Sequence, residues 1–252
     1  MKAIRLTFLI GILFLTPKLF AQIAHSHNDY EQKLPFEAAY NLGFDSIEAD
    51  LYLKDNEIFV AHDWNEIKLE RTFKNLYLNP LLLKIKADNG LSHQNKETLT
   101  LMLDLKKEGK EIIKALFERL KPYKKELKNV KIVLSGDMPP PKEFKNYDKI
   151  FFFDGRKELV YSKKEFRRVA FVSASFLDFG KYWMGITPMP DKTFRKIDLF
   201  VKEMHDKGKK VRLWATPNTI LGFETLMKLN VDIVGTDDLE LLANFLNMNG
   251  SN

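Results

Sequence analysis

Short apolar segments alternate with amphipathic segments along most of the chain. Eight of the short segments are rich in Val, Ile, Phe and Leu, which is typical of parallel strands that are buried on both faces. These predicted strands are residues 22–25, 44–50, 99–105, 131–135, 150–153, 169–173, 211–215 and 232–235. Segments with helical periodicity separate most of them, so we expect strand and helix to alternate through the chain.

The predicted helices are residues 35–42, 110–127, 191–207 and 218–229. In the second of them, apolar residues such as Ile112, Leu116 and Leu120 recur at the spacing of one helix face. An eightfold alternation of strand and helix predicts an α/β fold of the (β/α)8 TIM-barrel type. A doubly wound open sheet is the alternative, but no glycine-rich nucleotide-binding loop follows the first strand.

Two segments interrupt the alternation. Residues 51–60 contain Lys54-Asp55-Asn56 between two short strand-like pieces, which predicts a hairpin after the second strand. Residues 72–95 mix a Leu-rich helix with Asn and Lys. We expect them to form an excursion over one end of the barrel, where long insertions often shape the substrate site.

The first 21 residues have a different pattern from the rest. Lys2 and Arg5 precede a short apolar stretch, residues 6–16, and Ala21 supplies a small residue at its exit. This order is typical of a secretory signal peptide, so we expect a single barrel domain over 22–252, exported to the periplasm or secreted. An N-terminal membrane anchor is the alternative interpretation.

Composition narrows the function classes. The chain has no cysteine, which excludes disulfides, zinc ribbons and a cysteine nucleophile. The formal net charge is +6 and falls to +3 when the three basic residues of the leader, Lys2, Arg5 and Lys18, are removed. So small a charge does not indicate a nucleic-acid-binding protein, which usually needs a strongly basic face.

Polar clusters follow several of the predicted strands, where TIM barrels carry their chemistry. His25-Ser26-His27-Asn28-Asp29-Tyr30 begins at the end of the first strand, and two of the five histidines of the chain lie in it. This density of imidazole, amide and carboxyl groups favours a functional role over an ordinary loop.

Carboxylates are placed to bind a cation. Glu48 and Asp50 are two residues apart at the end of the second strand, so their side chains point to the same face. Two inward carboxylates repel each other unless a cation or protons neutralise them. Asp104, at the end of the next long strand, can complete a three-carboxylate site. The oxygen ligands suit Mg²⁺, Ca²⁺ or Mn²⁺.

Two further groups point to phosphate chemistry at the same barrel end. Val60-Ala61-His62-Asp63 places an imidazole after the hairpin, and Asp63 is a candidate for orienting it. Lys106 shares a strand face with Asp104 and can hold a phosphate oxygen as a compact cation. A structural Asp–Lys pair that caps the strand is the alternative for these two residues.

The order of these motifs resembles the superfamily of phosphatidylinositol-phospholipase-C-like phosphodiesterases. His25, Glu48-x-Asp50, His62-Asp63 and Asp104-x-Lys106 carry the resemblance, and Trp214 looks like the tryptophan of the family's seventh strand. The superfamily has a barrel fold and includes glycerophosphodiester phosphodiesterases and spider-type sphingomyelinases D. The His-Ser-His-Asn-Asp-Tyr stretch resembles a bacterial branch that is also similar to a fungal mitochondrial-inheritance protein.

The resemblance implies a metal-dependent phosphoric diester hydrolase, or a cyclising lyase, that acts on a glycerophosphodiester or a phospholipid-type substrate. It assigns one Mg²⁺ or Ca²⁺ to Glu48, Asp50 and Asp104, and it makes His25 and His62 the acid/base pair. Lys106, Asn28, His27 and Trp214 are the expected substrate-binding residues. A phospholipid substrate also implies transient contact with a membrane surface.

Departures from the family's pattern leave the substrate open. Ser26-His27 replaces the Arg-Gly that usually follows the first histidine of glycerophosphodiesterases, and Asp104 stands where a Glu is common. The Asp104-Leu105-Lys106 triplet is closer to sphingomyelinases D.

Two other functions fit parts of the sequence. A zinc amidohydrolase-type barrel would bind its metal through His25-x-His27, although no histidine ends the predicted fifth or sixth strand. A barrel that binds a phosphate-bearing ligand without catalysis is the third hypothesis.

Overall fold

The computed structural model describes residues 22–87 and 98–250 of the chain. Eight parallel strands of this part close into a barrel, because β1 pairs with both β2 and β9. The barrel strands are β1 (Ile23–Ser26), β2 (Ser46–Lys54), β4 (Leu99–Leu105), β5 (Val130–Gly136), β6 (Phe151–Arg156), β7 (Val169–Ser175), β8 (Val211–Trp214) and β9 (Ile233–Thr236). The predicted TIM-barrel fold is confirmed, and the predicted signal peptide lies outside the described residues.

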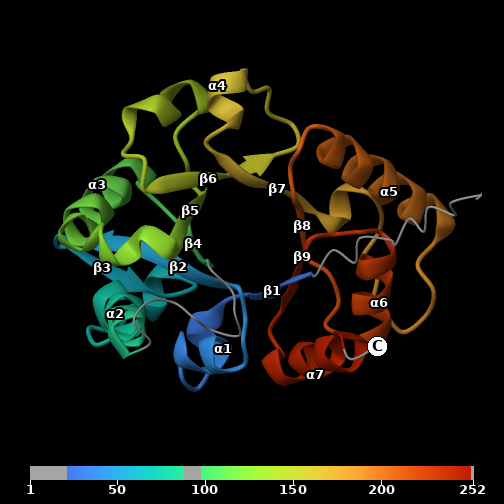
Figure 1. The fold of residues 1–252 in the computed structure, drawn as a ribbon, viewed down its shortest axis with the longest axis horizontal. Coiled ribbons are helices and arrows are strands. Elements are labelled where there is room, and N and C mark those ends of the chain that lie inside the picture. Colours follow the sequence, from blue (N-terminus) through green and yellow to red (C-terminus); the bar gives the residue numbers. More distant parts are fainter. Residues whose placement is uncertain (1–21, 88–97, 251–252) are drawn as a thin grey trace, which may run out of the picture.

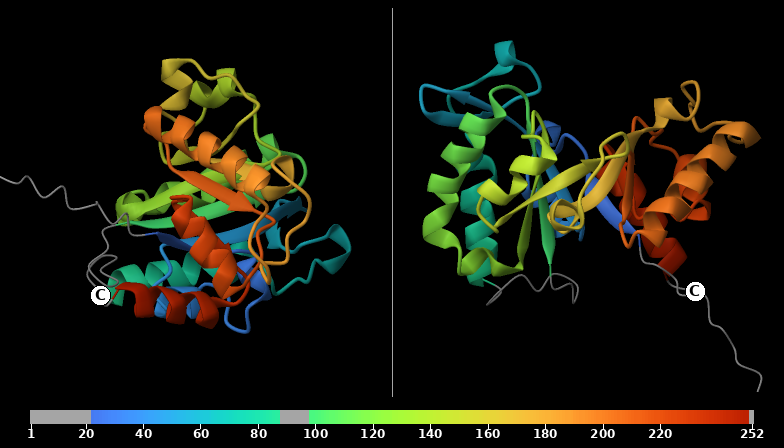
Figure 2. Two further views of the ribbon diagram at one scale, coloured as in Figure 1. Left: turned by 90° about the vertical axis from the view of Figure 1, so that its right-hand side faces the viewer. Right: turned by 90° about the horizontal axis from the view of Figure 1, so that it is seen from above.

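Helices surround this barrel on the outside, as Figures 1 and 2 show. They are α1 (Glu37–Asn41), α2 (Asn79–Ala87), α3 (Gly109–Leu120), α4 (Lys163–Phe166), α5 (Asp191–Asp206), α6 (Ile220–Lys228) and α7 (Leu239–Gly250). The sequence pattern did not predict α4 or α7. Among the described residues, none of these helices combines the length and apolar character needed to cross a bilayer.

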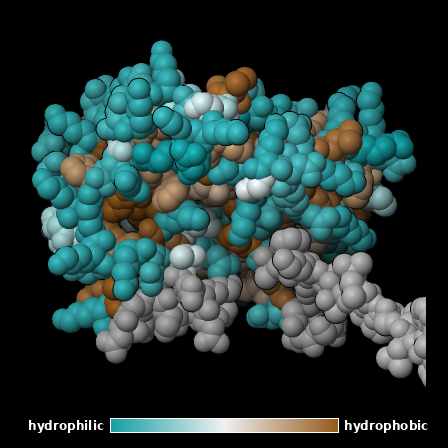
Figure 3. All heavy atoms as spheres, turned by 45° about the horizontal axis from the view of Figure 1, so that its top comes forward, coloured by the Kyte–Doolittle hydropathy of each residue, from teal (hydrophilic) through white to brown (hydrophobic). Residues whose placement is uncertain are grey.

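One apolar face of each long helix packs on the strands. In α5 the buried residues Ile197, Val201 and Met204 recur at helical spacing, while most of the charged residues between them face outwards. Full burial of one such aliphatic side chain stabilises the fold by about 1.5–3 kcal/mol. Figure 3 accordingly shows polar side chains over most of the face it draws, with smaller apolar areas between them.

The hairpin is confirmed. Strand β3 (Glu57–Val60) pairs antiparallel with β2. Asp55 and Asn56 both adopt positive φ, 49° and 60°, which is the backbone of a type I′ turn and suits the twist of a two-stranded ribbon. The hairpin carries the chain to His62 at the carboxyl end of the barrel.

The expected excursion over the barrel end is not observed. Residues 74–78 form a π-helical turn that leads into α2, and Leu81 of α2 is fully buried in the main core. α2 therefore belongs to the outer ring, beside α1 and α3 (Figure 1), because Leu81 buries better against the strands than over an open mouth. The rest of the expected excursion, residues 88–95, lies outside the described residues.

The helix predicted over 110–127 is also shorter than expected. α3 ends at Leu120, and two 3₁₀ turns, Lys121–Tyr123 and Glu126–Asn129, complete the connection to β5. Pro122 explains the end of the helix, because it has no N–H to donate and its ring collides with the preceding turn.

Candidate active site

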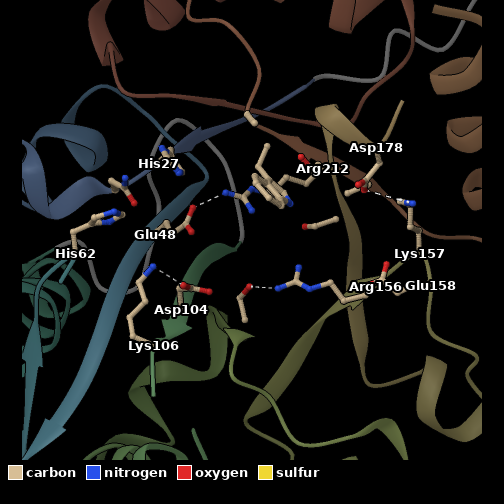
Figure 4. Close-up of a pocket in the computed structure, with 17 residues that line it drawn as sticks. His27, Glu48, His62, Asp104, Lys106, Arg156, Lys157, Glu158, Asp178 and Arg212 are labelled. Atoms are coloured by element: carbon tan, nitrogen blue, oxygen red, sulfur yellow. Dashed lines mark hydrogen bonds and ion pairs between the residues drawn. The ribbon is translucent and has the colours of Figure 1, made fainter. Parts of the chain in front are cut away.

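A cavity of about 900 Å³ opens at the carboxyl ends of the barrel strands. Figure 4 shows it with the side chains that line it. Its lining includes the predicted site residues His27, Asn28, Glu48, His62, Asp104, Lys106 and Trp214. Asp50 and His25 are buried and reach this group through hydrogen bonds to Lys106 and Glu48 respectively. The structure therefore brings the whole predicted set to one place.

His25 is fully buried and fixes Glu48. Its Nε2 lies 2.7 Å from Oε2 of Glu48, and its Nδ1 lies 2.7 Å from Oγ of Ser46. Since Glu48 is an acceptor, the arrangement favours the proton on Nε2, with the Ser46 hydroxyl donating to Nδ1. Burial and the nearby Arg212 guanidinium lower the pKa of His25 to about 4, so this imidazole is neutral near pH 7.

Glu48 remains ionised in spite of its burial. Burial alone would raise the pKa of this carboxyl, but the Arg212 guanidinium and the His25 hydrogen bond hold the pKa well below its usual range. The guanidinium donates through Nη2 to Oε2 at 2.6 Å. β8 thus supplies a counter-charge across the barrel to a carboxylate on β2.

Asp50 and Tyr30 orient His62. The Tyr30 hydroxyl donates to Oδ2 of Asp50 at 2.7 Å, and Nδ1 of His62 lies 3.3 Å from the same carboxylate oxygen and 3.1 Å from the hydroxyl. A proton on Nδ1 satisfies both acceptors, which leaves Nε2 with a free electron pair. The His62 side chain is 56% exposed and lines the cavity, so this nitrogen is open to a ligand.

Lys106 lies between two of the predicted metal ligands. Its Nζ is 2.7 Å from Oδ2 of Asp50 and 2.9 Å from Oδ2 of Asp104. Burial would lower the pKa of this ammonium, but the two carboxylates raise it above its ordinary value. Lys106 is therefore a fixed cation in the cavity wall.

Strand register explains why these side chains meet. Asp50 of β2 is paired with Asp104 of β4, and Asp104 is paired with Ser135 of β5. On the other side of the barrel, Arg156 of β6 is paired with Ser173 of β7, and Ser173 with Arg212 of β8. Side chains at paired positions point to the same face of a sheet. The mouth therefore has a carboxylate side and a guanidinium side.

Sequence reasoning missed the residues of the guanidinium side. Arg156 donates to Oδ2 of buried Asp154 and, through Nη2, to Oγ of Ser135 at 3.0 Å. The available signal was the presence of charged residues in apolar strands, Arg212 after Val211 and Asp154 after three phenylalanines. Such residues are rarely buried without a partner.

Other members of the first polar cluster have structural contacts. Asp29 is buried and accepts hydrogen bonds from the Ser26 hydroxyl at 2.7 Å, the Phe36 N–H at 2.5 Å and the Tyr77 hydroxyl at 3.1 Å. It therefore fixes the loop after β1. Asn28, in this loop, adopts the left-handed conformation at φ 45° and lines the cavity.

His27 contacts Asp237, in the loop after β9. Its Nδ1 lies 2.8 Å from Oδ1 of Asp237, whose other oxygen accepts from the Asn218 amide at 2.9 Å. Because β1 ends at Ser26, the strand alternation that would place both imidazoles on one face does not extend to His27. The two histidines do not form the shared zinc site that the amidohydrolase hypothesis needs.

The three carboxylates suit a hard divalent cation by their chemistry. They are oxygen donors from two adjacent strands, and the buried Oδ1 of Asp50 has no hydrogen-bond partner among the described residues. Lys106 and Arg212 neutralise them in the structure. Within residues 22–87 and 98–250, no three acidic or histidine side chains form a ready-made metal-binding group.

Asp63 is not placed to orient His62. Its backbone N–H donates to Oε2 of Glu66 at 3.2 Å, and Asp63 is the N-cap residue of the short 3₁₀ turn Trp64–Glu66. Trp214 is 44% exposed and presents an apolar wall to the cavity, as expected from its place at the end of β8.

Comparison with known proteins adds independent information. The sequence profile of the AIM6-like phosphodiesterase domain matches residues 15–130, the part that contains His25, Glu48, Asp50 and the later motifs through Lys106. The altered inheritance of mitochondria protein 6 homolog of Arthroderma benhamiae is 25% identical over 253 residues, which cover 85% of this chain and 81% of the relative. The corresponding protein of Eremothecium gossypii is 25% identical over 266 residues, with 88% and 68% covered.

The fold is similar to that of a solved enzyme. A glycerophosphodiester phosphodiesterase from Parabacteroides distasonis superposes with a TM-score of 0.59 at 15% identity, over 91% of this chain and 98% of that one. The profile match, the shared barrel and the order of the site residues agree. The sequence of residues 15–130 is thus similar to AIM6-like phosphodiesterase domains, and the barrel is similar in fold to a glycerophosphodiester phosphodiesterase.

Proposed function

We propose that the protein is a divalent-cation-dependent phosphodiesterase that acts on glycerophosphodiester or phospholipid-type substrates. The phosphodiesterase-type domain and barrel support the reaction class. The observation that carries the proposal is the charge of the cavity floor. This charged floor consists of Glu48, Asp50, Asp104 and Asp154 with Lys106, Arg156 and Arg212.

Burial raises the pKa of Asp50 and of Asp154. With all four carboxylates ionised, the charged floor has one negative charge in excess, since they meet three cationic side chains. His25 does not change this balance, because its pKa of about 4 keeps it neutral near pH 7. A divalent cation reverses the excess to one positive charge, which a phosphodiester monoanion then neutralises. A site of low dielectric favours such neutral combinations.

Glu48, Asp50 and Asp104 are the proposed ligands of Mg²⁺ or Ca²⁺. A divalent cation bound there supplies charge neutralisation at phosphoryl oxygens. Lys106 and Arg212 bind these carboxylates in the present arrangement and keep them from repelling one another. Removal of either cationic group therefore changes the affinity for the metal as well as for substrate.

His62 is the proposed proton-transfer residue on the open side of the cavity. Asp50 and Tyr30 hold its Nδ1, so Nε2 can take a proton from an attacking oxygen or, once protonated, give one to the leaving alcohol. His25 was expected to be the second member of the pair. Both its nitrogens are engaged, by Ser46 and by Glu48, which supports a positioning role for His25 instead. Comparison of His25→Ala with His62→Ala tests that assignment.

The test is a panel of diesters with the products followed by phosphorus NMR. Glycerophosphodiesters, phosphatidylinositol, sphingomyelin and lysophospholipids are incubated with Mg²⁺, with Ca²⁺ and with EDTA. We expect turnover of at least one diester with a divalent cation and none with EDTA. A phosphomonoester product indicates attack by water, whereas a cyclic phosphate indicates attack by a neighbouring hydroxyl of the substrate.

Two outcomes contradict the proposal. Turnover that is undiminished in EDTA after exhaustive dialysis removes the metal from the reaction. Binding of diesters without turnover, in every metal, supports a barrel that holds a phosphate-bearing ligand and does not cleave it. Asp50→Asn, which changes a proposed ligand, should abolish turnover. Asp178→Asn is its matched control, because Asp178 lines the cavity but lies outside the ligand set.

A further inference from the structure

The side of the mouth opposite the predicted metal ligands carries two guanidinium groups. Arg156 at the end of β6 and Arg212 in β8 flank Ser173 of β7, and the three are paired in register. All three line the cavity. Figure 4 shows Arg156 extending into the cavity from the side opposite Asp104 and Lys106. We call Arg156 and Arg212 the guanidinium pair.

Both guanidinium groups donate hydrogen bonds to side chains of other barrel strands. Arg156 donates to Asp154 and to Ser135, and Arg212 donates to Glu48. Asp154 and Glu48 are buried, so these contacts are shielded from water. The pair is therefore fixed before any ligand arrives, which removes much of the entropy cost of ordering long side chains on binding.

Donor capacity remains on both groups. A guanidinium has five N–H donors, and Arg156 uses Nη1 and Nη2 for its two contacts with the fold. Arg212 is 4% exposed, and its Nε has no hydrogen-bond partner among the described residues. A buried donor left unpaired is costly, so a ligand that offers oxygen acceptors is strongly favoured at this position.

The guanidinium pair adjoins the carboxylates closely. Arg212 contacts Glu48 at 2.6 Å, and Arg156 contacts Ser135, which is the register neighbour of Asp104. A ligand oxygen bound by the pair therefore lies next to the predicted metal ligands. This closeness favours one phosphoryl group shared by both sides over a second, remote anion.

We propose that Arg156 and Arg212 bind the non-bridging phosphoryl oxygens of the diester substrate. This inference rests on the proposed phosphodiesterase function and adds the residues that hold the reacting group. Planar guanidinium groups match phosphate oxygens with paired hydrogen bonds, which a lysine at the same place cannot reproduce. The guanidinium pair binds the phosphoryl oxygens, whereas the Lys106 ammonium forms ion pairs with Asp50 and Asp104.

The test uses dimethyl phosphate, a diester monoanion that is hydrolysed too slowly to be consumed. Its dissociation constant is measured by phosphorus NMR titration with saturating Mg²⁺ and, separately, with EDTA. Mg²⁺ affinity is measured by calorimetry without any phosphate. For the parent protein we expect binding of dimethyl phosphate that is stronger with Mg²⁺ than with EDTA, because the charged floor is then positive.

Arg156→Met is the main variant, because Arg156 is less buried than Arg212 and its loss is the safer change for folding. We expect its affinity for dimethyl phosphate to fall about tenfold to a hundredfold, as for loss of a charged hydrogen bond. Its Mg²⁺ affinity should stay within about twofold of the parent, since Arg156 touches none of the predicted ligands. Arg156→Lys should recover only part of the loss.

Lys157→Met is the matched control. Lys157 also lines the cavity, and its replacement removes one positive charge as well. Its Nζ lies 3.5 Å from Oδ2 of Asp178, and both side chains are partly exposed. We expect an affinity within about twofold of the parent, because an exposed pair contributes little. If Arg156→Met and Lys157→Met lose the same affinity for dimethyl phosphate, the loss reflects only the net charge of the cavity. That result overturns the specific role of Arg156.

The results separate this inference from the proposed function. If the parent binds and cleaves diesters but Arg156→Met binds dimethyl phosphate as tightly, the guanidinium pair is not the phosphoryl site while the function stands. If the parent shows no turnover but its binding of dimethyl phosphate depends on Arg156, the guanidinium pair is a phosphoryl-binding site and the proposed catalytic function is wrong. If the parent binds no dimethyl phosphate in either condition, the inference is wrong.

Discussion

Only Nδ1 of the His62 imidazole contacts other side chains of the described residues, so Nε2 is the nitrogen that faces the cavity. Nδ1 meets Asp50 and the Tyr30 hydroxyl, while the ring is more than half exposed at the cavity. We predict that His62→Ala lowers kcat about 10²–10⁴-fold, the usual contribution of a positioned acid or base. Steady-state kinetics on a diester found active in the panel provide the measurement.

The control for His62→Ala is His205→Ala. His205 pairs with Asp232 at the start of β9, away from the cavity lining, so its loss should leave kcat within about twofold. A nitrophenyl diester, whose leaving group needs little protonation, should be spared in His62→Ala if His62 is the acid. Full activity of His62→Ala on all diesters contradicts the assignment.

A buried carboxylate, Asp29, holds the loop after β1 by accepting from two hydroxyls and one backbone N–H. Asp29→Asn replaces an acceptor oxygen by an NH₂ group and leaves at least one buried donor unpaired. We predict a loss of about 1–3 kcal/mol in the free energy of unfolding, measured by urea denaturation. The exposed turn residue Asp55 provides the control, and Asp55→Asn should change stability by less than about 0.5 kcal/mol.

At the scale of elements, the loops that follow β1 and β9 are joined by an ion pair. His27 donates to Asp237, and Asp237 also accepts from Asn218 in the loop after β8. Burial alone would lower the pKa of His27, but the hydrogen bond to Asp237 raises it. The same bond lowers the pKa of Asp237. The pair therefore links three strand ends around the site where the barrel closes.

These pKa shifts predict how stability depends on pH. The His27 contribution is complete below its ordinary pKa of 6.5 and is lost as the pH rises through the raised folded value. The Asp237 contribution is present above 3.8 and is lost as the pH falls through the lowered folded value. His27→Gln lacks the titrating imidazole. We therefore predict that, between pH 6 and pH 9, its free energy of unfolding falls by less than that of the parent, as measured by chemical denaturation. Parallel curves of unfolding free energy against pH for the two proteins contradict this prediction. The difference between the proteins should stay below about 1 kcal/mol, because the His27–Asp237 pair is partly exposed.

At the scale of the whole molecule, a cation that binds only the folded barrel must stabilise it. At one hundred times the dissociation constant, this linkage contributes about 2.7 kcal/mol. We predict that Mg²⁺ or Ca²⁺ raises Tm by about 5–10 °C, since 1 kcal/mol corresponds to about 2–4 °C in a chain of this size. Differential scanning calorimetry with and without EDTA measures the shift.

Asp50→Asn identifies the source of that thermal shift. The variant keeps its shape but has one charge fewer for a cation, so the shift should fall to near zero. Asp178→Asn should retain it. A shift of parental size in Asp50→Asn places the cation elsewhere on the protein, whatever the enzyme activity of the variant.

The elements and their order were predictable because burial imposes periodicity. Strands buried on both faces are short apolar runs, and outer helices such as α5 have one apolar stripe. The two corrections came from competition between local and tertiary forces. Leu81 of α2 is buried against the barrel wall and not over the mouth, and α3 ends before Pro122 although its apolar pattern continues.

The candidate site was predictable where its residues are close in sequence or recur in a known order. Glu48 and Asp50 share a face by strand alternation alone, and that relation survives any tertiary arrangement. The guanidinium pair had no such local signal, because Arg156 and Arg212 are brought to one level only by the register of β6, β7 and β8.

The sequence by itself determined the barrel and the polar residues at its strand ends, since these depend on periodicity and on motifs of neighbouring residues. Only the tertiary structure decided how charges pair across the mouth. Arg212 lies 164 positions from Glu48 in the chain, yet barrel closure brings them to 2.6 Å. It also decided that His25 is buried while His62 is open, because burial depends on what the rest of the chain places around each side chain.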